Sequence, residues 1–220
     1  MATHQDTVMT PQQDNGPVRI RPFRPDDMDL LFEAARESVR EVSPWLPWCH
    51  AAYSRDEAAR WVASRPEAWA KGAEYSFAIV AGSGGRFLGG CGLNQIHAQH
   101  RFANLGYWVR TSAAGQGIAS AATLLAARFG FVELGLVRVE IVVDVDNTQS
   151  QRVAEKVNAT REGVERQRLV IGGRVRDAVM FSLLPEDLGL ERLPAMRSPG
   201  LQEISDAGYP CPSMAWTPNS

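Results

Sequence analysis

The segment from residue 104 to residue 132 constrains the fold most, because a strand-like run passes through a glycine-rich turn into an amphipathic helix. Residues 104–109 are strand-like, and the turn Gly115-Gln116-Gly117 follows. The helix then has an apolar stripe at spacings of three and four, made of Ile118, Ala122, Leu125, Phe129 and Val132. Such a turn presents backbone N–H groups and the positive end of a helix dipole to an anion. The segment therefore predicts a phosphate-binding turn.

The two glycines also have a purely structural interpretation, since a tight turn can require positive φ at both of them. The turn is not a Walker loop, because no Lys-Ser/Thr pair follows Gly117. It is not the dinucleotide fingerprint either, because Ser120 stands where that pattern requires glycine. The spacing alone leaves phosphate binding and a simple tight turn open.

The rest of the chain is typical of an alternation of strands and helices. We expect strands over residues 18–21, 75–80, 87–93, 104–109, 136–143, 160–171 and 174–184. We expect helices that begin near residues 26 and 54, and two more over residues 118–132 and 147–157. Ser54 and Glu57 have capping-box spacing, Asn147 can cap the last helix, and Cys91 alternates inward as a small core residue. A polar loop should contain His97 and His100, which we do not expect to bind a metal.

Length and composition predict one domain with two tails. A chain of 220 residues suits a single core, and we expect the domain at residues 18–187, a disordered leader at 1–17 and a Pro-rich tail at 188–220. A net charge of −2 argues against a dedicated nucleic-acid binder. Three widely spaced cysteines predict neither a disulfide framework nor a zinc site. Without an apolar leader or a membrane-length apolar run, the sequence predicts a soluble protein of the cytoplasm with no membrane partner.

Four motifs together resemble the GNAT superfamily of N-acetyltransferases, and within it the RimJ/RimL group. They are Leu105-Gly106-Tyr107-Trp108-Val109-Arg110, Gly115-Gln116-Gly117-Ile118-Ala119, Asp146-Asn147-Thr148-Gln149-Ser150 and Glu155-Lys156. The resemblance extends over residues 18–187. The sequence departs from the family pattern in two places, since Ala114 replaces an Arg or Gln and Asn158-Ala159 replaces Gly-Phe.

The resemblance implies an α/β (α+β) fold with a central mixed, mostly antiparallel twisted sheet, splayed between its fourth and fifth strands and flanked by helices. It implies acetyl-CoA as the co-substrate and no metal. Pantetheine would pair with the end of the fourth strand and the pyrophosphate would bind the turn. The cofactor-binding residues implied are Trp108, Val109, Arg110, Ala114, Gly115, Gln116, Gly117, Ile118, Ala119 and Asn147.

The resemblance also implies a catalytic role for Ser150, which would assist the departing CoA thiolate, although a first-turn serine can simply bond to the backbone. No single general base stands out. Four carboxylates are candidates, each of which can also be a solvated surface group: Glu37, Glu41, Glu162 and Glu165. The Pro-flanked Trp45 and Trp48 could wall the acceptor pocket or cover the core. Arginines between residues 161 and 176 could favour an acidic acceptor or form a solvated hairpin.

Three functions follow from these patterns. The first is an enzyme that transfers the acetyl group of acetyl-CoA to a primary amine by direct attack in a ternary complex. The acceptor would be a small molecule or a protein N-terminus. The second is a degenerate module that binds acyl-CoA without turnover, suggested by Ala114 and by the lack of an evident base. The third is a protein-interaction scaffold that uses the tryptophan loop and the Pro-rich tail. The oligomeric state stays open, with a homodimer as one option.

Overall fold

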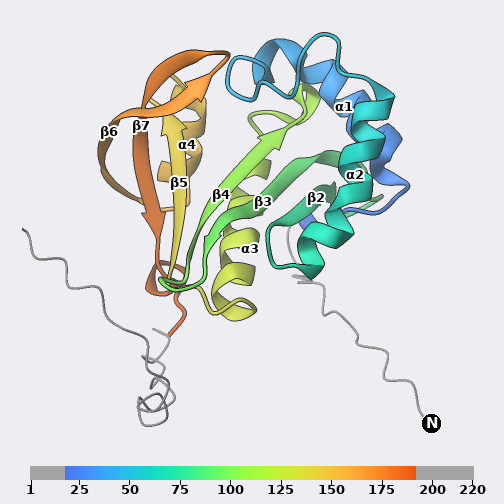
Figure 1. The fold of residues 1–220 in the computed structure, drawn as a ribbon. Coiled ribbons are helices and arrows are strands. Elements are labelled where there is room, and N and C mark those ends of the chain that lie inside the picture. The colour runs from blue at the N-terminus through green and yellow to red at the C-terminus, as the bar shows by residue number, and fades with distance from the viewer. Residues whose placement is uncertain (1–17, 192–220) are drawn as a thin grey trace, which may run out of the picture.

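The computed structural model describes residues 18–191, so the predicted leader and residues 192–220 of the predicted tail lie outside the described residues. Within them, seven strands form one sheet flanked by four α-helices (Figure 1). The strands are β1 (Val18–Pro22), β2 (Tyr75–Ala81), β3 (Phe87–His97), β4 (Phe102–Val109), β5 (Arg138–Asp144), β6 (Thr160–Ile171) and β7 (Arg174–Leu183). The α-helices are α1 (Asp27–Val42), α2 (Arg55–Ala70), α3 (Ile118–Val132) and α4 (Thr148–Lys156). Short 3-10 helices occur at Thr111–Ala113 and Pro185–Leu188.

The sheet has the strand order β1-β2-β3-β4-β5-β7-β6 and is antiparallel except between β4 and β5. Those two strands pair in parallel only at Phe102↔Arg138, Ala103↔Val139 and Asn104↔Glu140. Beyond Asn104 they diverge, as the V between β4 and β5 in Figure 1 shows. The predicted mixed, mostly antiparallel sheet with a splay between the fourth and fifth strands is confirmed.

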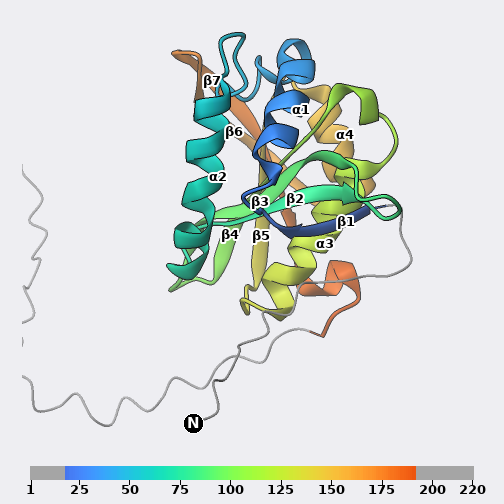
Figure 2. The same cartoon turned by 90° about the vertical axis from the view of Figure 1, so that its right-hand side faces the viewer.

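Helices α1 and α2 lie on one face of the sheet and α3 and α4 on the other (Figure 2), and strands β2 and β3 are buried on both faces. Strand β2 shows why, because its successive side chains point to opposite faces. Phe77 and Ile79 belong to the core under α3, whereas Ala78 and Val80 belong to the core under α1 and α2. The continuous apolar run from residue 77 to residue 81 therefore suits a strand that is covered on both faces.

Local sequence signals set the helix starts as predicted. Ser54 and Glu57 form a reciprocal capping box, in which the Ser54 side chain accepts from Glu57 N–H and the Glu57 side chain accepts from Ser54 N–H. Asn147 caps α4 through a 3.0 Å bond from the Ser150 N–H to its Oδ1. After α4, Asn158 adopts a left-handed conformation with φ of 58°, which asparagine tolerates.

Three details differ from or extend the sequence-based prediction. Strand β3 continues past Leu93 to His97, because Asn94 and His97 still pair with β4 across an irregular register. His97 therefore belongs to a strand, and its ring stacks on those of His100 and Phe102. Val132, predicted in the buried stripe of α3, is 55% exposed, because the helix ends there. Leu188 and Leu190 pack against the core, so described structure continues past residue 187.

None of the helices in residues 18–191 is long and apolar enough to cross a membrane.

Candidate active site

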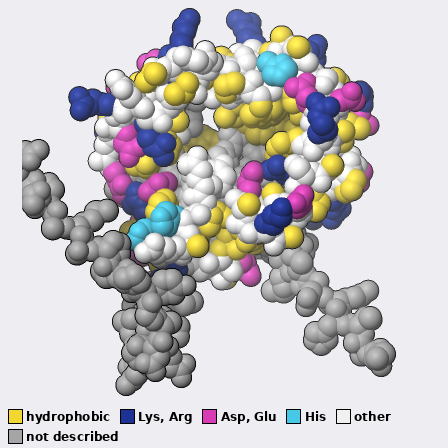
Figure 3. All heavy atoms as spheres, in the orientation of Figure 1, with side chains coloured by type: hydrophobic (Ala, Val, Ile, Leu, Met, Phe, Trp, Pro, Cys, Tyr) yellow, Lys and Arg dark blue, Asp and Glu magenta, His cyan; other side chains and the backbone are white. Residues whose placement is uncertain are grey.

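The divergence of β4 and β5 opens a cavity of about 550 Å³, visible as the central hollow in Figure 3. It is lined by both strands, by the turn before α3, by the first turns of α4, by the end of α1 and the loop after it, and by the end of β6. Of the residues that the sequence predicts for the site, the lining includes Trp45, Trp108, Val109, Ala114, Gly115, Gly117, Ile118, Ala119, Asn147 and Ser150. Arg110, Gln116 and Trp48 are not part of the lining.

The end of β4 has backbone groups that face the cavity. The Arg110 N–H donates to the Leu88 carbonyl at 2.8 Å, so it points toward β3. Because backbone groups alternate between the two edges of a strand, those of Val109 point the other way, toward β5. Strand β5 pairs with β4 only as far as Asn104, so the Val109 N–H faces the gap. This edge can hydrogen-bond an extended amide chain such as pantetheine.

The glycine-rich turn beside this edge is shaped for an anion. Gly115 and Gly117 have φ of 76° and 77°, which glycine adopts without strain. Gly117 is the N-cap of α3, and a Cβ at either glycine would meet only open space within 4 Å. The turn is therefore held by backbone conformation and not by packing against protein atoms. The positive end of the α3 dipole and its free N–H groups face the cavity, so the residues fit a pyrophosphate.

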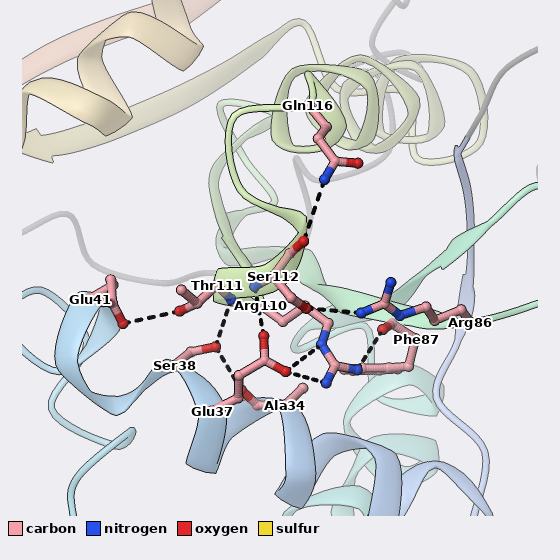
Figure 4. A network of polar contacts seen from close by, with 10 residues as sticks. All are labelled: Ala34, Glu37, Ser38, Glu41, Arg86, Phe87, Arg110, Thr111, Ser112 and Gln116. Carbon is pink, nitrogen blue, oxygen red and sulfur yellow. Dashed lines mark hydrogen bonds and ion pairs between the residues drawn. The ribbon is translucent and has the colours of Figure 1, made fainter.

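Three side chains on α1 hold the chain between β4 and this turn (Figure 4). The Glu37 carboxylate accepts from the Ser112 N–H at 2.6 Å and pairs with the Arg110 guanidinium. The Ser38 hydroxyl accepts from the Thr111 N–H at 3.0 Å, and Glu41 accepts from the Thr111 hydroxyl at 3.0 Å. We call this set of contacts the α1 clamp. It positions the chain that leads into the anion-binding turn.

Hydrogen bonds within the protein hold the side chains of two predicted site residues outside the cavity lining, and one of them belongs to the α1 clamp. The side chain of Arg110 is occupied by Glu37 and by the Phe87 carbonyl, and Gln116 donates to the Ser112 carbonyl. The hydrogen bond from Arg110 lowers the pKa of Glu37 to about 2. A carboxylate held in this way is a poor proton acceptor, so the structure argues against Glu37 as the general base.

Ser150 lies in the first turn of α4 and borders the cavity. Its N–H is bonded to Asn147, and its hydroxyl oxygen lies 2.9 Å from the phenol oxygen of Tyr107 on β4. The phenol oxygen also lies 3.0 Å from the Ser150 carbonyl oxygen. Burial raises the pKa of Tyr107 to about 12, although the bond with Ser150 opposes that rise. Tyr107 thus joins β4 to α4 across the gap.

The part of the cavity wall formed by the loop after α1 and by the β6–β7 hairpin is apolar. Trp45, Leu46 and Pro47 line it from the loop after α1, and residues 169–171 line it from the β6–β7 hairpin. Trp48 turns away and packs edge-on against Trp108 and Tyr53, with ring centroids 5.3 Å and 5.5 Å apart. The structure therefore separates the two tryptophans that the sequence predicted together.

Among the described residues, two carboxylates line the cavity, Glu41 and Asp144. Burial alone would raise the pKa of Asp144, but the bidentate contact with Arg176 and the Asp146 N–H outweigh it, and that pKa is lowered. Glu41 is exposed and accepts the Thr111 hydroxyl.

The two carboxylates predicted on β6 lie outside the cavity lining. Glu162 pairs with Arg138 at 2.6 Å and accepts from Ser182, and these contacts lower its pKa to about 2. Arg138 lies where β4 and β5 still pair, at the closed end of the gap. Glu165 pairs with Arg168 at 2.8 Å.

The sequence motifs indicated no role for Tyr107, although it lies within the motif of residues 105–110. Its hydroxyl meets a residue 43 positions later, so no local spacing could indicate the contact. The contribution of Leu169, Val170 and Ile171 at the end of β6 was also missed, because their place at the cavity depends on how the β6–β7 hairpin lies in the folded chain. A splayed strand pair beside an anion-binding turn fits an extended ligand that carries a pyrophosphate, such as an acyl-CoA.

Comparisons with known proteins agree with this class. The family described as "Acetyltransferase (GNAT) domain" matches residues 18–160. "Putative ribosomal N-acetyltransferase YdaF" of Bacillus subtilis (strain 168) is 29% identical over 175 residues, which are 79% of this chain and 94% of that protein. The structure of Mycobacterium smegmatis RimJ in complex with CoA-disulfide has a TM-score of 0.72 at 26% identity, over 80% of this chain and 85% of that one. A RimL complex with coenzyme A, with a TM-score of 0.71 at 22% identity, shares the fold over 78% of this chain and 96% of that one.

The chain belongs to the GNAT family of acetyltransferases, because the family match spans well over half of it. It is an N-acetyltransferase that takes the acetyl group from acetyl-CoA. The predicted family, fold and co-substrate are thereby confirmed.

Proposed function

We propose that this enzyme acetylates the α-amine of a polypeptide by direct attack on acetyl-CoA in a ternary complex. The observation that supports this most is that the anion-binding turn and an exposed apolar surface both line the same cavity. Donor and acceptor can then meet in the gap between β4 and β5. Acetyl-CoA supplies the activated acetyl thioester, and the chain supplies binding, orientation and proton acceptance.

On the donor side, the roles follow from the direction of backbone groups. The N–H groups of residues 115–119 hold the pyrophosphate, with the α3 dipole favouring its charge. The Val109 N–H, which faces the gap, hydrogen-bonds the thioester carbonyl and stabilises the negative charge that grows on its oxygen during attack. Ser150 donates a hydrogen bond to the departing sulfur. Because an aliphatic hydroxyl is a far weaker acid than a thiol, Ser150 keeps its own proton.

On the acceptor side, Glu41 receives the proton that the amine loses. It lines the cavity and is exposed, and the Thr111 hydroxyl orients its carboxylate. The other lining carboxylate, Asp144, is committed to Arg176. At pH 7.5 about a quarter of α-amines but only about 0.1% of lysine amines are unprotonated. A single solvated carboxylate therefore suits an α-amine better than a lysine.

A polypeptide acceptor is supported by the apolar surface that continues outward from the cavity. Val170, at the cavity wall, is 70% exposed, and its cross-strand partner Val175 is 59% exposed. A free small amine would lie within the cavity and leave this hairpin tip uncovered. A polypeptide can extend from the amine across it. YdaF and a Vibrio cholerae protein of known structure, 27% identical with a TM-score of 0.69, are also named as putative ribosomal or ribosomal-protein acetyltransferases.

The test is thiol release from acetyl-CoA with a matched acceptor panel. It contains peptides with a free N-terminus, the same peptides with a blocked N-terminus and one lysine, and small amines. We expect turnover with the free N-termini and at least tenfold lower kcat/KM for the other two groups. Comparable kcat/KM for the small amines would contradict a polypeptide acceptor.

The role of Glu41 is tested by Glu41→Gln, with Glu33→Gln on the same helix but outside the cavity lining as the control. Loss of a proton acceptor lowers kcat by ~10²-fold at neutral pH and moves the rate rise toward higher pH. Glu33→Gln should behave like the parent. Equal pH profiles for the parent and Glu41→Gln would remove Glu41 from the mechanism.

A further inference from the structure

The phenol of Tyr107 has one proton, and two oxygens of Ser150 lie within hydrogen-bond distance of it. The Tyr107 oxygen lies 2.9 Å from the Ser150 hydroxyl oxygen and 3.0 Å from the Ser150 carbonyl oxygen. The carbonyl can only accept, whereas the serine hydroxyl can accept or donate. Two arrangements of protons are therefore compatible with the same heavy-atom positions.

In the first arrangement the phenol donates to the carbonyl, and the serine proton points at the Tyr107 oxygen. In the second the phenol donates to the serine oxygen, and the serine proton is directed away from Tyr107. The Ser150 backbone is fixed by its N–H bond to Asn147, so rotation of the hydroxyl distinguishes the two arrangements. Ser150 borders the cavity, and only the second arrangement frees its proton for a group bound there.

Tyr107 itself does not exchange its proton in either arrangement. Burial raises the pKa of Tyr107 to about 12, so the phenol is neutral near pH 7. A neutral phenol is a hydrogen-bond donor and acceptor and not a base. Tyr107 also lines the cavity, but the oxygens that its phenol meets within hydrogen-bond distance both belong to Ser150, so we expect its effect on chemistry to pass through Ser150.

We propose that Tyr107 is a positioning residue, which donates its O–H to the Ser150 hydroxyl oxygen and so directs the serine proton toward the departing CoA sulfur. The inference rests on the proposed function. During transfer, the amine forms a C–N bond to the acetyl carbon and the C–S bond breaks with its electron pair staying on sulfur. The proton lost by the amine goes to Glu41, while Ser150 and Tyr107 each keep their own proton.

A purely structural role for Tyr107 makes a different prediction. If the phenol only ties β4 to α4 through the Ser150 carbonyl, its removal should lower thermal stability and leave the chemistry of Ser150 intact. The effects of Tyr107→Phe and Ser150→Ala would then be independent. If Tyr107 acts through Ser150, its effect should vanish once Ser150 is absent.

The test is a double-mutant cycle of Tyr107→Phe, Ser150→Ala and the double variant. Tyr75→Phe is the control, because it also removes a phenol hydroxyl from a half-buried tyrosine, on β2 and outside the cavity lining. We expect Ser150→Ala to lower kcat by ~10²-fold and Tyr107→Phe by ~10-fold. The KM for acetyl-CoA should stay fixed, and the double variant should be no slower than Ser150→Ala. Tyr75→Phe should retain the parent kcat.

A second readout needs no acceptor. The thiolate of bound CoA is titrated by its ultraviolet absorbance in the parent and in each variant. A hydrogen bond from Ser150 stabilises the thiolate, so Ser150→Ala and Tyr107→Phe should each raise the pKa of the bound thiol by about 1. The double variant should raise it no further.

Multiplicative losses in kcat, or a bound-thiol titration that Tyr107→Phe leaves unchanged, would overturn the inference. Failure of the proposed function gives a different pattern. In that case no amine is acetylated by the parent, while the thiol titration still reports whether Tyr107 acts through Ser150.

Discussion

Replacing Gly117 by aspartate tests the anion-binding turn most directly. Gly117 is the N-cap of α3 in a left-handed conformation, with φ of 77° and ψ of 2°. A Cβ there meets no protein atom within 4 Å. The variant should therefore fold, with left-handed strain of about 1–2 kcal/mol. Attraction between the new carboxylate and the α3 dipole would offset part of that strain by about 0.3–1 kcal/mol.

The effect on the ligand is larger. A carboxylate about 5 Å from one phosphate charge is repelled by about 1 kcal/mol in water and by about 3 kcal/mol at an effective dielectric constant of 20. The side chain also occupies the space that the open turn leaves for the pyrophosphate. The loss of CoA affinity should be about 2–4 kcal/mol, or roughly 30- to 700-fold in Kd.

The assay is isothermal calorimetry with CoA, beside a thermal melt of each variant. Gly84→Asp is the matched control, because Gly84 also has a left-handed φ, of 74°, and no atom within 4 Å of a Cβ, but lies in the β2–β3 turn outside the cavity lining. Both variants carry the same strain and the same charge. Only Gly117→Asp should lose affinity. Equal CoA affinity in Gly117→Asp and Gly84→Asp would show that the turn does not hold the pyrophosphate.

Three further predictions follow from contacts of the described residues. The pKa of Glu37 is about 2 in the folded protein, against an ordinary 4.5. Its contribution to the free energy of unfolding is therefore fully present above pH 4.5 and is lost as the pH falls toward 2. With screening at this partly exposed site, Glu37→Gln should cost about 1–2 kcal/mol at pH 7 and little at pH 2, measured by denaturant unfolding. Trp45→Ala should raise the acceptor KM. Trp48→Ala should leave that KM unchanged and lower the melting temperature, because the Trp48 ring is 36% exposed but packs edge-on against Trp108 and Tyr53; the reverse pattern in KM would contradict the placement of the two rings. Val170→Ser should raise the KM of a peptide acceptor and not that of acetyl-CoA, and an unchanged peptide KM would remove the hairpin tip from the acceptor site.

The sequence by itself determined the features whose causes are local. Alternation of side chains and spacings of three and four set the strands and helices, since these periods reflect backbone geometry within a few residues. The capping box at Ser54 and Glu57 and the cap at Asn147 needed only neighbours three positions away. The turn around Gly115 and Gly117 was likewise visible, because positive φ is a demand on single residues.

The tertiary structure decided which candidates meet. Glu37 and Glu41 lie one helical turn apart on α1, yet Glu37 is bound by Arg110, 73 positions later, while Glu41 faces the cavity. Trp45 and Trp48 separate for the same reason, since the loop places one ring at the cavity and packs the other edge-on against Trp108. Sequence patterns report burial and local conformation but not which distant side chain supplies the partner.

The contact between Tyr107 and Ser150 shows the limit most clearly. Each residue sits in a motif that the sequence displays, one in β4 and one in α4. Their 2.9 Å approach depends on how far β4 and β5 diverge beyond Asn104, which is set by the packing of the whole sheet against α3 and α4. The sequence determined the two elements. The geometry that brings the two hydroxyls together exists only in the folded chain, because no local interaction fixes the width of the gap between them.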